Sequence, residues 1–251
     1  MSAQPISANG GQRVLELRSV QAAYARSQVL FGVDLAVGAG EVATLVGRNG
    51  MGKTTTVRCI VGLLRLSSGN ITFDGNRIDG APSYRICQAG IGLVPEGRQI
   101  FPNLSVRENL LCHGVSRNAA ETRWTLERVL EMFPPLAERL GHSGNRLSGG
   151  EQQMLAIGRA LMTNPKLLIL DEATEGLAPL MREQIWTCVE SLKRKQQAIL
   201  LIDKNLERML EIADRHYVLE KGRVAWSGTS NELRADPSVG LRYLEVGQAV
   251  G

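Results

Sequence analysis

Hydrophobic residues along the chain form short runs that predict buried strands. Residues 41–46, 167–170 and 198–202 read EVATLV, LLIL and AILLI, and these runs are apolar at nearly every position. Strands that are apolar on both faces are typical of parallel sheets covered by helices. Because helical patterns lie between and around these runs, the chain is predicted to form an α/β core with a parallel sheet.

Two other segments predict antiparallel hairpins. Residues 71–78 read ITFDGNRI and carry an Asp-Gly pair, which is a strong turn signal. Residues 216–228 read HYVLEKGRVAWSG, with a Lys-Gly pair at the expected turn. We therefore expect antiparallel strands to flank the parallel core.

The middle of the chain, from about 101 to 161, has a helical pattern and no strand-like run. One helical face collects the apolar residues Leu126, Val129, Leu130 and Phe133. Pro134-Pro135 is predicted to end that helix.

These patterns divide the chain into three parts. We expect a loose tail over residues 1–12, and a nucleotide-binding α/β core with its antiparallel β part over 13–95 and 165–251. A helical insertion is expected over 96–164.

Composition narrows the class of protein. The 251 residues are 43% hydrophobic and 22% charged, an ordinary globular balance, and the net charge is 29 − 25 = +4. The four cysteines form no CxxC pair, which argues against a metal site ligated by cysteines and for a reducing compartment. Apolar runs stay well below the ~18 residues of a membrane span, and no signal peptide is predicted. We expect the chain to meet a membrane only through a partner.

Residues 47–54 match the phosphate-loop pattern G-x-x-x-x-G-K-[ST]. Gly47 and Gly52 let the backbone curl so that N–H groups point at phosphate oxygens, and the following helix adds its positive end. Lys53 would reach the β- and γ-phosphates, and the Thr54 hydroxyl would bind Mg²⁺. A strand before the loop and an amphipathic helix after it support this interpretation.

The segment LLILDE supplies the acids that a phosphate loop requires. Asp171 would hold Mg²⁺, and Glu172 would orient or deprotonate the attacking water. Taken alone, the same pair could be an acidic helix cap after a strand.

The segment LSGGEQQ, residues 147–153, predicts a capped helix. Ser148 and Glu151 have the spacing of a capping box, and Gly149 and Gly150 open a second anion site at the helix start. Taken alone, this stretch indicates nothing more than a well-capped helix.

Taken together, the phosphate loop, LSGGEQQ and LLILDE resemble the ATP-binding domain of ABC transporters, over about residues 13–245. The resemblance implies a P-loop NTPase core with a helical insertion that carries the signature LSGGE, and ATP and Mg²⁺ as cofactors. It also implies that two such domains close around two nucleotides, with each signature helix contacting ATP held by the opposite subunit. The nucleotide-binding residues implied are Tyr24, Gly47, Asn49, Gly50, Gly52, Lys53, Thr54, Thr55, Ser148, Gly149 and Gly150.

Four positions of this sequence matter within the family pattern. Tyr24 lies where an aromatic ring stacks on adenine. Glu96 replaces the usual Gln, Ala178 the usual Asp, and Lys204 the usual switch His. Because Glu96 and Lys204 carry opposite charges, we hypothesise that they are coupled, with Glu96 assisting the metal and Lys204 acting as a fixed cation.

The segments VPEGRQIFPNLSVRENL and DEATEGLAP are similar to those of ATP-binding subunits from branched-chain amino acid importers. That likeness implies a paralogous ATPase or a second copy of this chain, two membrane permeases and an extracytoplasmic substrate-binding protein. It places the chain at the cytoplasmic face of the inner or plasma membrane. The loop from Glu96 to Phe101, including Arg98, is the expected docking site for a permease helix.

Two alternatives stay open from the sequence. The cargo could be urea, an amide or an aromatic acid, because no residue of an ATPase subunit touches the cargo. More remotely, the chain could be an ABC ATPase acting on nucleic acid. The single ATPase unit and the lack of a dense Lys/Arg stripe argue against nucleic acid as a partner.

Overall fold

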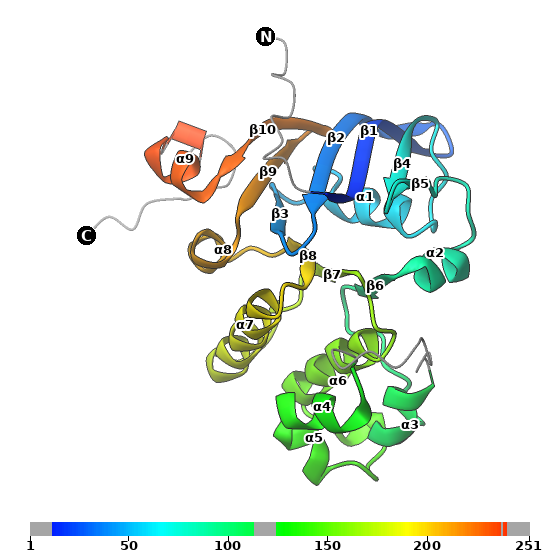
Figure 1. The fold of residues 1–251 in the computed structure, drawn as a ribbon, viewed down its shortest axis with the longest axis vertical. Coiled ribbons are helices and arrows are strands. Elements are labelled where there is room, and N and C mark those ends of the chain that lie inside the picture. The colour runs from blue at the N-terminus through cyan, green and yellow to red at the C-terminus, as the bar shows by residue number, and fades with distance from the viewer. Residues whose placement is uncertain (1–11, 113–123, 237, 240–251) are drawn as a thin grey trace.

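The computed structural model describes residues 12–112, 124–236 and 238–239, and the strands in these parts form two sheets (Figure 1). The larger sheet has the strand order β10-β9-β3-β8-β7-β6. Its strands are β3 (Val42–Val46), β6 (Ile91–Val94), β7 (Leu167–Asp171), β8 (Ala198–Ile202), β9 (Arg215–Glu220) and β10 (Arg223–Thr229). The pairs from β9 through β6 are parallel, and β10 joins the edge as an antiparallel hairpin. The parallel core expected from the apolar runs is confirmed.

The smaller sheet is antiparallel, with the order β2-β1-β4-β5. Its strands are β1 (Arg13–Tyr24), β2 (Ser27–Gly38), β4 (Ser68–Phe73) and β5 (Asn76–Arg77). Both predicted hairpins are present, since Asp74 and Gly75 join β4 to β5, and Lys221 and Gly222 join β9 to β10.

Helices cover the larger sheet and form a separate group at one end of the molecule (Figure 1). They are α1 (Lys53–Ile60), α2 (Ser83–Ala89), α3 (Val106–Leu111), α4 (Leu126–Met132), α5 (Pro134–Glu138), α6 (Gly149–Leu161), α7 (Pro179–Arg194), α8 (Leu206–Ile212), α9 (Ser230–Ala235) and the 3-10 turn η1 (Gly144–Arg146). Helices α3 to α6 lie together at the end away from the antiparallel sheet. Within the described residues, none of the helices has both the length and the apolar content to cross a membrane.

The double proline has a second effect that the sequence prediction left out. It follows α4, as expected, but Pro134 is also the first residue of α5. Proline suits the first turn of a helix, because its fixed φ is helical and its missing N–H would be unpaired there anyway.

Two apolar clusters fill the interior and share the larger sheet between them. One includes Val57 and Ile60 of α1 with the inner residues of both sheets, and the other joins that sheet to α6 and α7. Leu168 and Ile169 are neighbours on β7, are both fully buried, and belong to different clusters. Burial on both faces explains why the parallel strands read as continuous apolar runs.

Candidate functional site

The phosphate loop lies between β3 and α1, and its glycines have backbone conformations that other residues rarely adopt. Gly47 has φ +150°, Gly50 +78° and Gly52 +106°. A Cβ on Gly47 would lie 2.3 Å from the carbonyl oxygen of Leu219 in β9. Because that oxygen belongs to a sheet strand and cannot move aside easily, only glycine fits at this position.

Lys53 is the first residue of α1, and its side chain folds back over the loop. Its Nζ donates to the carbonyl oxygens of Gly47 at 2.8 Å and Arg48 at 3.2 Å. Burial lowers the pKa of Lys53, and the neighbouring carboxylate of Glu172 partly opposes this shift. Carbonyl oxygens are weaker partners for an ammonium than the oxyanions of a phosphate. The side chain is therefore already placed where a phosphate could replace these contacts.

A pocket of 290 Å³ beside the loop brings most of the predicted catalytic and loop residues together. Its lining comprises Val29, Asn49, Gly50, Gly52, Lys53, Thr54, Thr55, Glu96, Glu172, Glu175 and Lys204. These residues come from segments far apart in the sequence, and the parallel order β3-β8-β7 brings three of those segments to one edge of the sheet. Nine of them were expected from the sequence, whereas Glu175 and Val29 were not.

Asp171 ends β7 and has a carboxyl oxygen without a protein partner. The side chain is buried, and Oδ1 makes no hydrogen bond to another described residue. Burial raises the pKa of Asp171 to about 6, and the charge of Glu96 adds to the shift. An orphaned buried carboxylate oxygen is costly, and a divalent cation or its bound water would satisfy it. The site therefore fits Mg²⁺, the metal that the sequence predicts.

Glu172 follows Asp171 in an unusual backbone conformation. Its φ is +52°, in the left-handed region, and its backbone N–H donates to Ile202 O at 2.8 Å. A hydrogen bond shared with the carboxyl of Glu175 raises the pKa of Glu172 to about 7, and burial adds to the shift. Glu172 thus titrates near neutral pH, the range that suits a general base.

Lys204 follows β8 and pairs with a residue that the sequence analysis missed. Its ammonium forms an ion pair with Glu175 and lies 3.9 Å from Oε2 of Glu172. Glu96 raises the pKa of Lys204 less than Glu175 does, and Lys204 has no ion pair with Glu96 among the described residues. The structure therefore shows Glu175 as the direct partner of Lys204, and the coupling between Glu96 and Lys204 stays a prediction. The missed signal was a second Glu in TEGLAP, three positions after Glu172.

Tyr24 lies at the end of β1, outside the lining of the 290 Å³ pocket. The ring is 39% exposed, and its hydroxyl accepts a hydrogen bond from Nη1 of Arg58 in α1 at 3.0 Å. An exposed ring beside the helix that follows the phosphate loop is compatible with base stacking. Its adenine contact stays a prediction.

The signature residues begin α6, in the helical group, and do not line the phosphate pocket. Ser148 caps the helix through the predicted capping box with Glu151, which is confirmed in both directions. A Cβ on Gly149 would lie 3.0 Å from Nη1 of Arg98, and one on Gly150 would lie 2.2 Å from Cε of Met181. A single chain therefore keeps its two predicted anion-binding elements apart.

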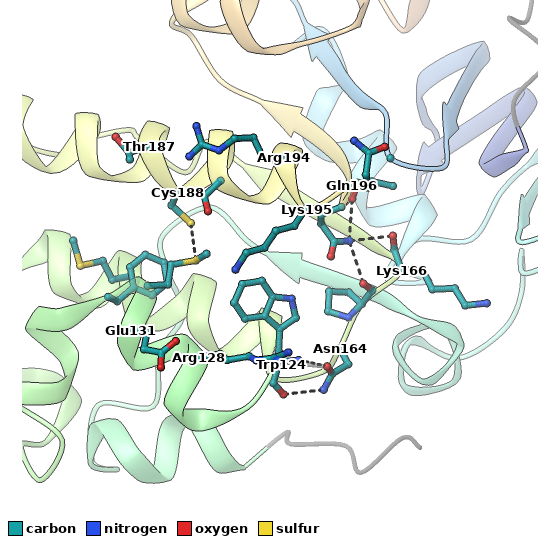
Figure 2. A pocket seen from close by; sticks show the side chains of 18 of the residues that line it. Trp124, Arg128, Glu131, Asn164, Lys166, Thr187, Cys188, Arg194, Lys195 and Gln196 are labelled. Carbon is teal, nitrogen blue, oxygen red and sulfur yellow. Dashed lines mark hydrogen bonds between the residues drawn. The ribbon is translucent and has the colours of Figure 1, made fainter. Parts of the chain in front are cut away.

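A larger cleft of 1510 Å³ lies elsewhere, between the helical group and the segment that joins α7 to the start of β8. Figure 2 shows Lys195 above the Trp124 ring, with Nζ 4.7 Å from its centroid. The backbone N–H of Trp124 donates to Oδ1 of Asn164 at 2.6 Å, which fastens the chain before α4 to the end of α6. None of the predicted site residues lines this cleft.

Comparison with known proteins agrees with the site geometry. The family model described as "ABC transporter" matches residues 30–175. The chain is 42% identical over 231 residues to the high-affinity branched-chain amino acid transport ATP-binding protein BraG of Pseudomonas aeruginosa, covering 92% of this chain and 99% of BraG. It is 36% identical over 220 residues to the probable branched-chain amino acid transport ATP-binding protein LivF of Archaeoglobus fulgidus, covering 86% and 93% of the two chains.

Other relatives and a solved structure fit the same family. The lipopolysaccharide export system ATP-binding protein LptB of Escherichia coli is 34% identical over 232 residues, covering 92% of this chain and 96% of LptB. A nucleotide-free ATP-binding cassette from an ABC transporter has a TM-score of 0.80 at 26% identity, covering 94% of this chain and all of that one. The chain belongs to the ATP-binding subunits of the ABC transporter family, which are ATPases.

Proposed function

We propose that this chain is the ATP-hydrolysing subunit of an ABC importer that takes up branched-chain or related amino acids. The single observation that carries the cargo class is the 42% identity to BraG over nearly the full length of both chains. The chain shares its fold and family motifs with ABC ATPases of other cargoes, so the motifs alone support only the ATPase.

ATP is bound through the phosphate loop. Lys53 contacts the β- and γ-phosphates, while loop N–H groups from Asn49 to Thr55 surround the phosphate oxygens. Tyr24 stacks on the adenine ring. The buried ammonium of Lys53, now on carbonyl oxygens, gains stronger partners when the nucleotide enters.

Mg²⁺ is held by Thr54, Asp171 and Glu96. The orphaned Oδ1 of Asp171 supports this assignment, because it lacks a protein partner in the described part of the chain. When bound, the ion neutralises charge on the transferring phosphoryl group. Oxygens from Glu96, Glu172 and Glu175 also lie within 4.8 Å of one another, so the pocket is acidic and suited to a nucleotide that carries its own cation.

Hydrolysis depends on two residues that face the same pocket. Glu172 accepts a proton from the attacking water, and its pKa near 7 suits that role. Lys204 supplies a fixed positive charge where most family members use a histidine. Glu96, which comes from a different segment of the chain, supports the metal.

The complete ATP site is composite. Ser148, Gly149 and Gly150 contact the γ-phosphate of ATP held by another subunit, either a paralogous ATPase or a second copy of this chain. This assignment is supported by their absence from the phosphate pocket of their own chain. The core of 13–95 and 165–251, together with Glu96, then contributes to one ATP site, and the signature residues of the helical part of 96–164 contribute to another.

The assembled importer also contains two membrane permeases and works with an extracytoplasmic substrate-binding protein. The chain is held at the cytoplasmic face of the inner or plasma membrane through the permeases. Phe101 is 41% exposed in the loop expected to receive a permease helix. Urea, amide or aromatic acid transport is the alternative within the same design, and nucleic acid is not expected as a partner.

The decisive experiment traps the ATP-bound assembly. Glu172→Gln keeps the phosphate loop but removes the base, so MgATP binds and accumulates a closed dimer, most readily with the paralogous ATPase. Size-exclusion chromatography with and without MgATP measures this change. A Glu172→Gln chain that binds ATP and stays monomeric with its partner present would refute the composite site. Uptake of labelled leucine against urea by the reconstituted importer then decides the cargo.

A further inference from the structure

Two loops that leave neighbouring strands meet through the ion pair between Lys204 and Glu175. The parallel register places Asp171 of β7 beside Ile202 of β8, so the two strands end at the same level. Glu175 lies four residues after Asp171, and Lys204 lies two residues after Ile202. Their side chains meet over the phosphate pocket, which both of them line.

A buried aspartate fixes the two loops to each other. One oxygen of Asp203 accepts a hydrogen bond from the Thr174 hydroxyl at 2.7 Å, and the other accepts from the backbone N–H of Lys204 at 2.8 Å and of Asn205 at 3.0 Å. Both Asp203 and Thr174 are buried. The backbones that carry Glu175 and Lys204 are therefore held in place, while the side chains themselves stay on the surface of the pocket.

The Lys204 side chain needs something to hold its charge in the pocket. It is 52% exposed, and a lysine stem has four rotatable bonds, so solvent competes for the ammonium. Glu175 binds that ammonium directly, and the second carboxylate, Glu172, lies 3.9 Å away. The pair with Glu175 also raises the pKa of Lys204, which keeps the ammonium charged.

We propose that Glu175 is a positioning residue that holds the Lys204 ammonium beside Glu172, where it can reach the γ-phosphate of bound ATP. The proposal rests on the proposed function, since it needs ATP in this pocket and Lys204 in the switch role. Exposed ion pairs contribute little to stability, so the pair acts on geometry rather than on folding. We expect the pair to act on the rate of the chemical step. An ammonium already held near the developing charge does not have to be ordered in the transition state.

A kinetic double-mutant cycle tests the proposal in the full chain assembled with its partner. Glu175→Gln and Lys204→Met are made singly and together, and kcat and KM for MgATP are measured. We expect Glu175→Gln to lower kcat about tenfold with KM within about twofold, because the ammonium loses its position but not its binding loop. In the Lys204→Met background, the same substitution has a smaller effect, because only the hydrogen bond between Glu175 and Glu172 is then lost. Glu175→Asp keeps the charge and recovers part of kcat.

A matched control tests whether the loss of an exposed carboxylate outside the phosphate pocket also lowers kcat. Glu183→Gln removes a similarly exposed carboxylate that lies 3.4 Å from Arg208, outside the lining of the phosphate pocket, and leaves kcat unchanged. Thermal unfolding of each variant checks that it folds, and Glu175→Asp carries the test if Glu175→Gln does not.

Four results would overturn the proposal. They are an unchanged kcat in Glu175→Gln, an equal loss in the Lys204→Met background, a raised KM at constant kcat, and a shifted Mg²⁺ requirement. The last would make Glu175 a metal ligand with Glu96 and Glu172. These outcomes are distinct from failure of the proposed function, which would appear as MgATP binding by Lys53→Ala that equals the wild type.

Discussion

The two predicted phosphate-binding elements of this chain differ in how completely their polar groups are paired. At the signature end, the Ser148–Glu151 capping box pairs the helix start, and Glu151 is also bound by Arg139 at 2.5 Å. At the phosphate-loop end, Asp171 has an orphaned oxygen and Lys53 rests on carbonyl groups.

The difference suggests a division of labour. An element with unsatisfied groups gains from a ligand by itself, so the phosphate pocket can bind MgATP in a single chain. At the signature end the capping box already pairs the helix start, and the glycines offer a close backbone approach; further along, Nε2 of Gln153 is buried without a partner in the described residues. Under the composite-site proposal, the signature end adds to binding when another subunit presents a phosphate, and so it would act on dimer closure and hydrolysis.

The largest expected effect falls on the phosphate pocket. Lys53→Ala removes the one buried ammonium of the loop, and we expect affinity for MgATP to fall roughly hundredfold or more. Equilibrium binding of a fluorescent ATP analogue measures the loss. Lys166→Ala serves as the control, since Lys166 pairs with Asp74 and lines the larger cleft instead. Equal affinity in the two variants would contradict the division of labour.

The signature end is tested by a charge at Gly149, where the added Cβ would lie 3.0 Å from Nη1 of Arg98 and this flexible side chain would have to shift. Gly149→Glu places a carboxylate in the first turn of α6, where negative charge favours the helix. That carboxylate would repel a phosphate from another subunit. We expect MgATP affinity of the single chain to be unchanged and ATPase activity of the assembly to fall roughly hundredfold.

Gly141→Glu is the matched control for that experiment. Gly141 also lies in the helical group, and a Cβ there would have no heavy atom within 4 Å. Loss of ATP binding in the isolated Gly149→Glu chain would show that the signature acts within its own subunit.

The loop between the two regions is expected to affect transport more than hydrolysis. Phe101 is exposed, and the guanidinium of Arg159 in α6 lies 5.0 Å from its ring centroid. Arg159 also donates to Gln99 O at 2.8 Å, and this hydrogen bond holds the loop against the signature helix α6. Phe101→Ala removes the exposed ring, and we expect uptake to fall about fivefold with basal ATPase within about twofold.

Uptake and ATPase activity are measured on the same vesicles that contain the assembled importer. Phe101→Tyr keeps the ring and its contact with Arg159, and should retain uptake. A proportional loss of both activities in Phe101→Ala would indicate a catalytic or folding role.

Local sequence was enough to predict the parts of the site that one segment builds alone. The phosphate loop depends on glycines at fixed spacing, and the capping box depends on Ser148 and Glu151 three residues apart. The apolar runs gave the strand positions within a residue or two, because burial on both faces leaves few polar choices. The fold class follows from the same alternation of strands and helices.

The parts that could not be predicted depend on register between strands. Glu175 and Lys204 are 29 residues apart, and they meet only because β7 and β8 are paired so that Asp171 lies opposite Ile202. Charge alone suggested Glu96 as the partner of Lys204, since both belong to the same family site. Asp203 was also missed, because a carboxylate that clamps two loops has no local sequence pattern.

The last expected effect is on stability rather than on activity, and it distinguishes the sheet under the phosphate loop from the helical group by pH. His216 of β9 is buried between Thr44, 2.7 Å from its Nδ1, and Ser230, 2.8 Å from its Nε2. Ser230 donates its own proton to Ala213 O, so Nε2 carries the imidazole proton and Nδ1 accepts from Thr44. Burial lowers the pKa of His216 to about 4, the charge of Arg234 adds to this, and Asp214 opposes it.

The sign of the pH effect follows from that lowered pKa. Between about pH 6.5 and pH 4 the unfolded chain binds a proton at His216 that the folded chain does not. Stability from this residue is therefore complete above about pH 6.5 and lost as the pH falls to about 4, by about 3 kcal/mol at most. Hydrogen exchange should show β3 and β9 losing protection on acidification before α6 does. His216→Asn removes this titration, so its exchange should depend less on pH over the same range, and an unchanged dependence would assign the effect to other groups.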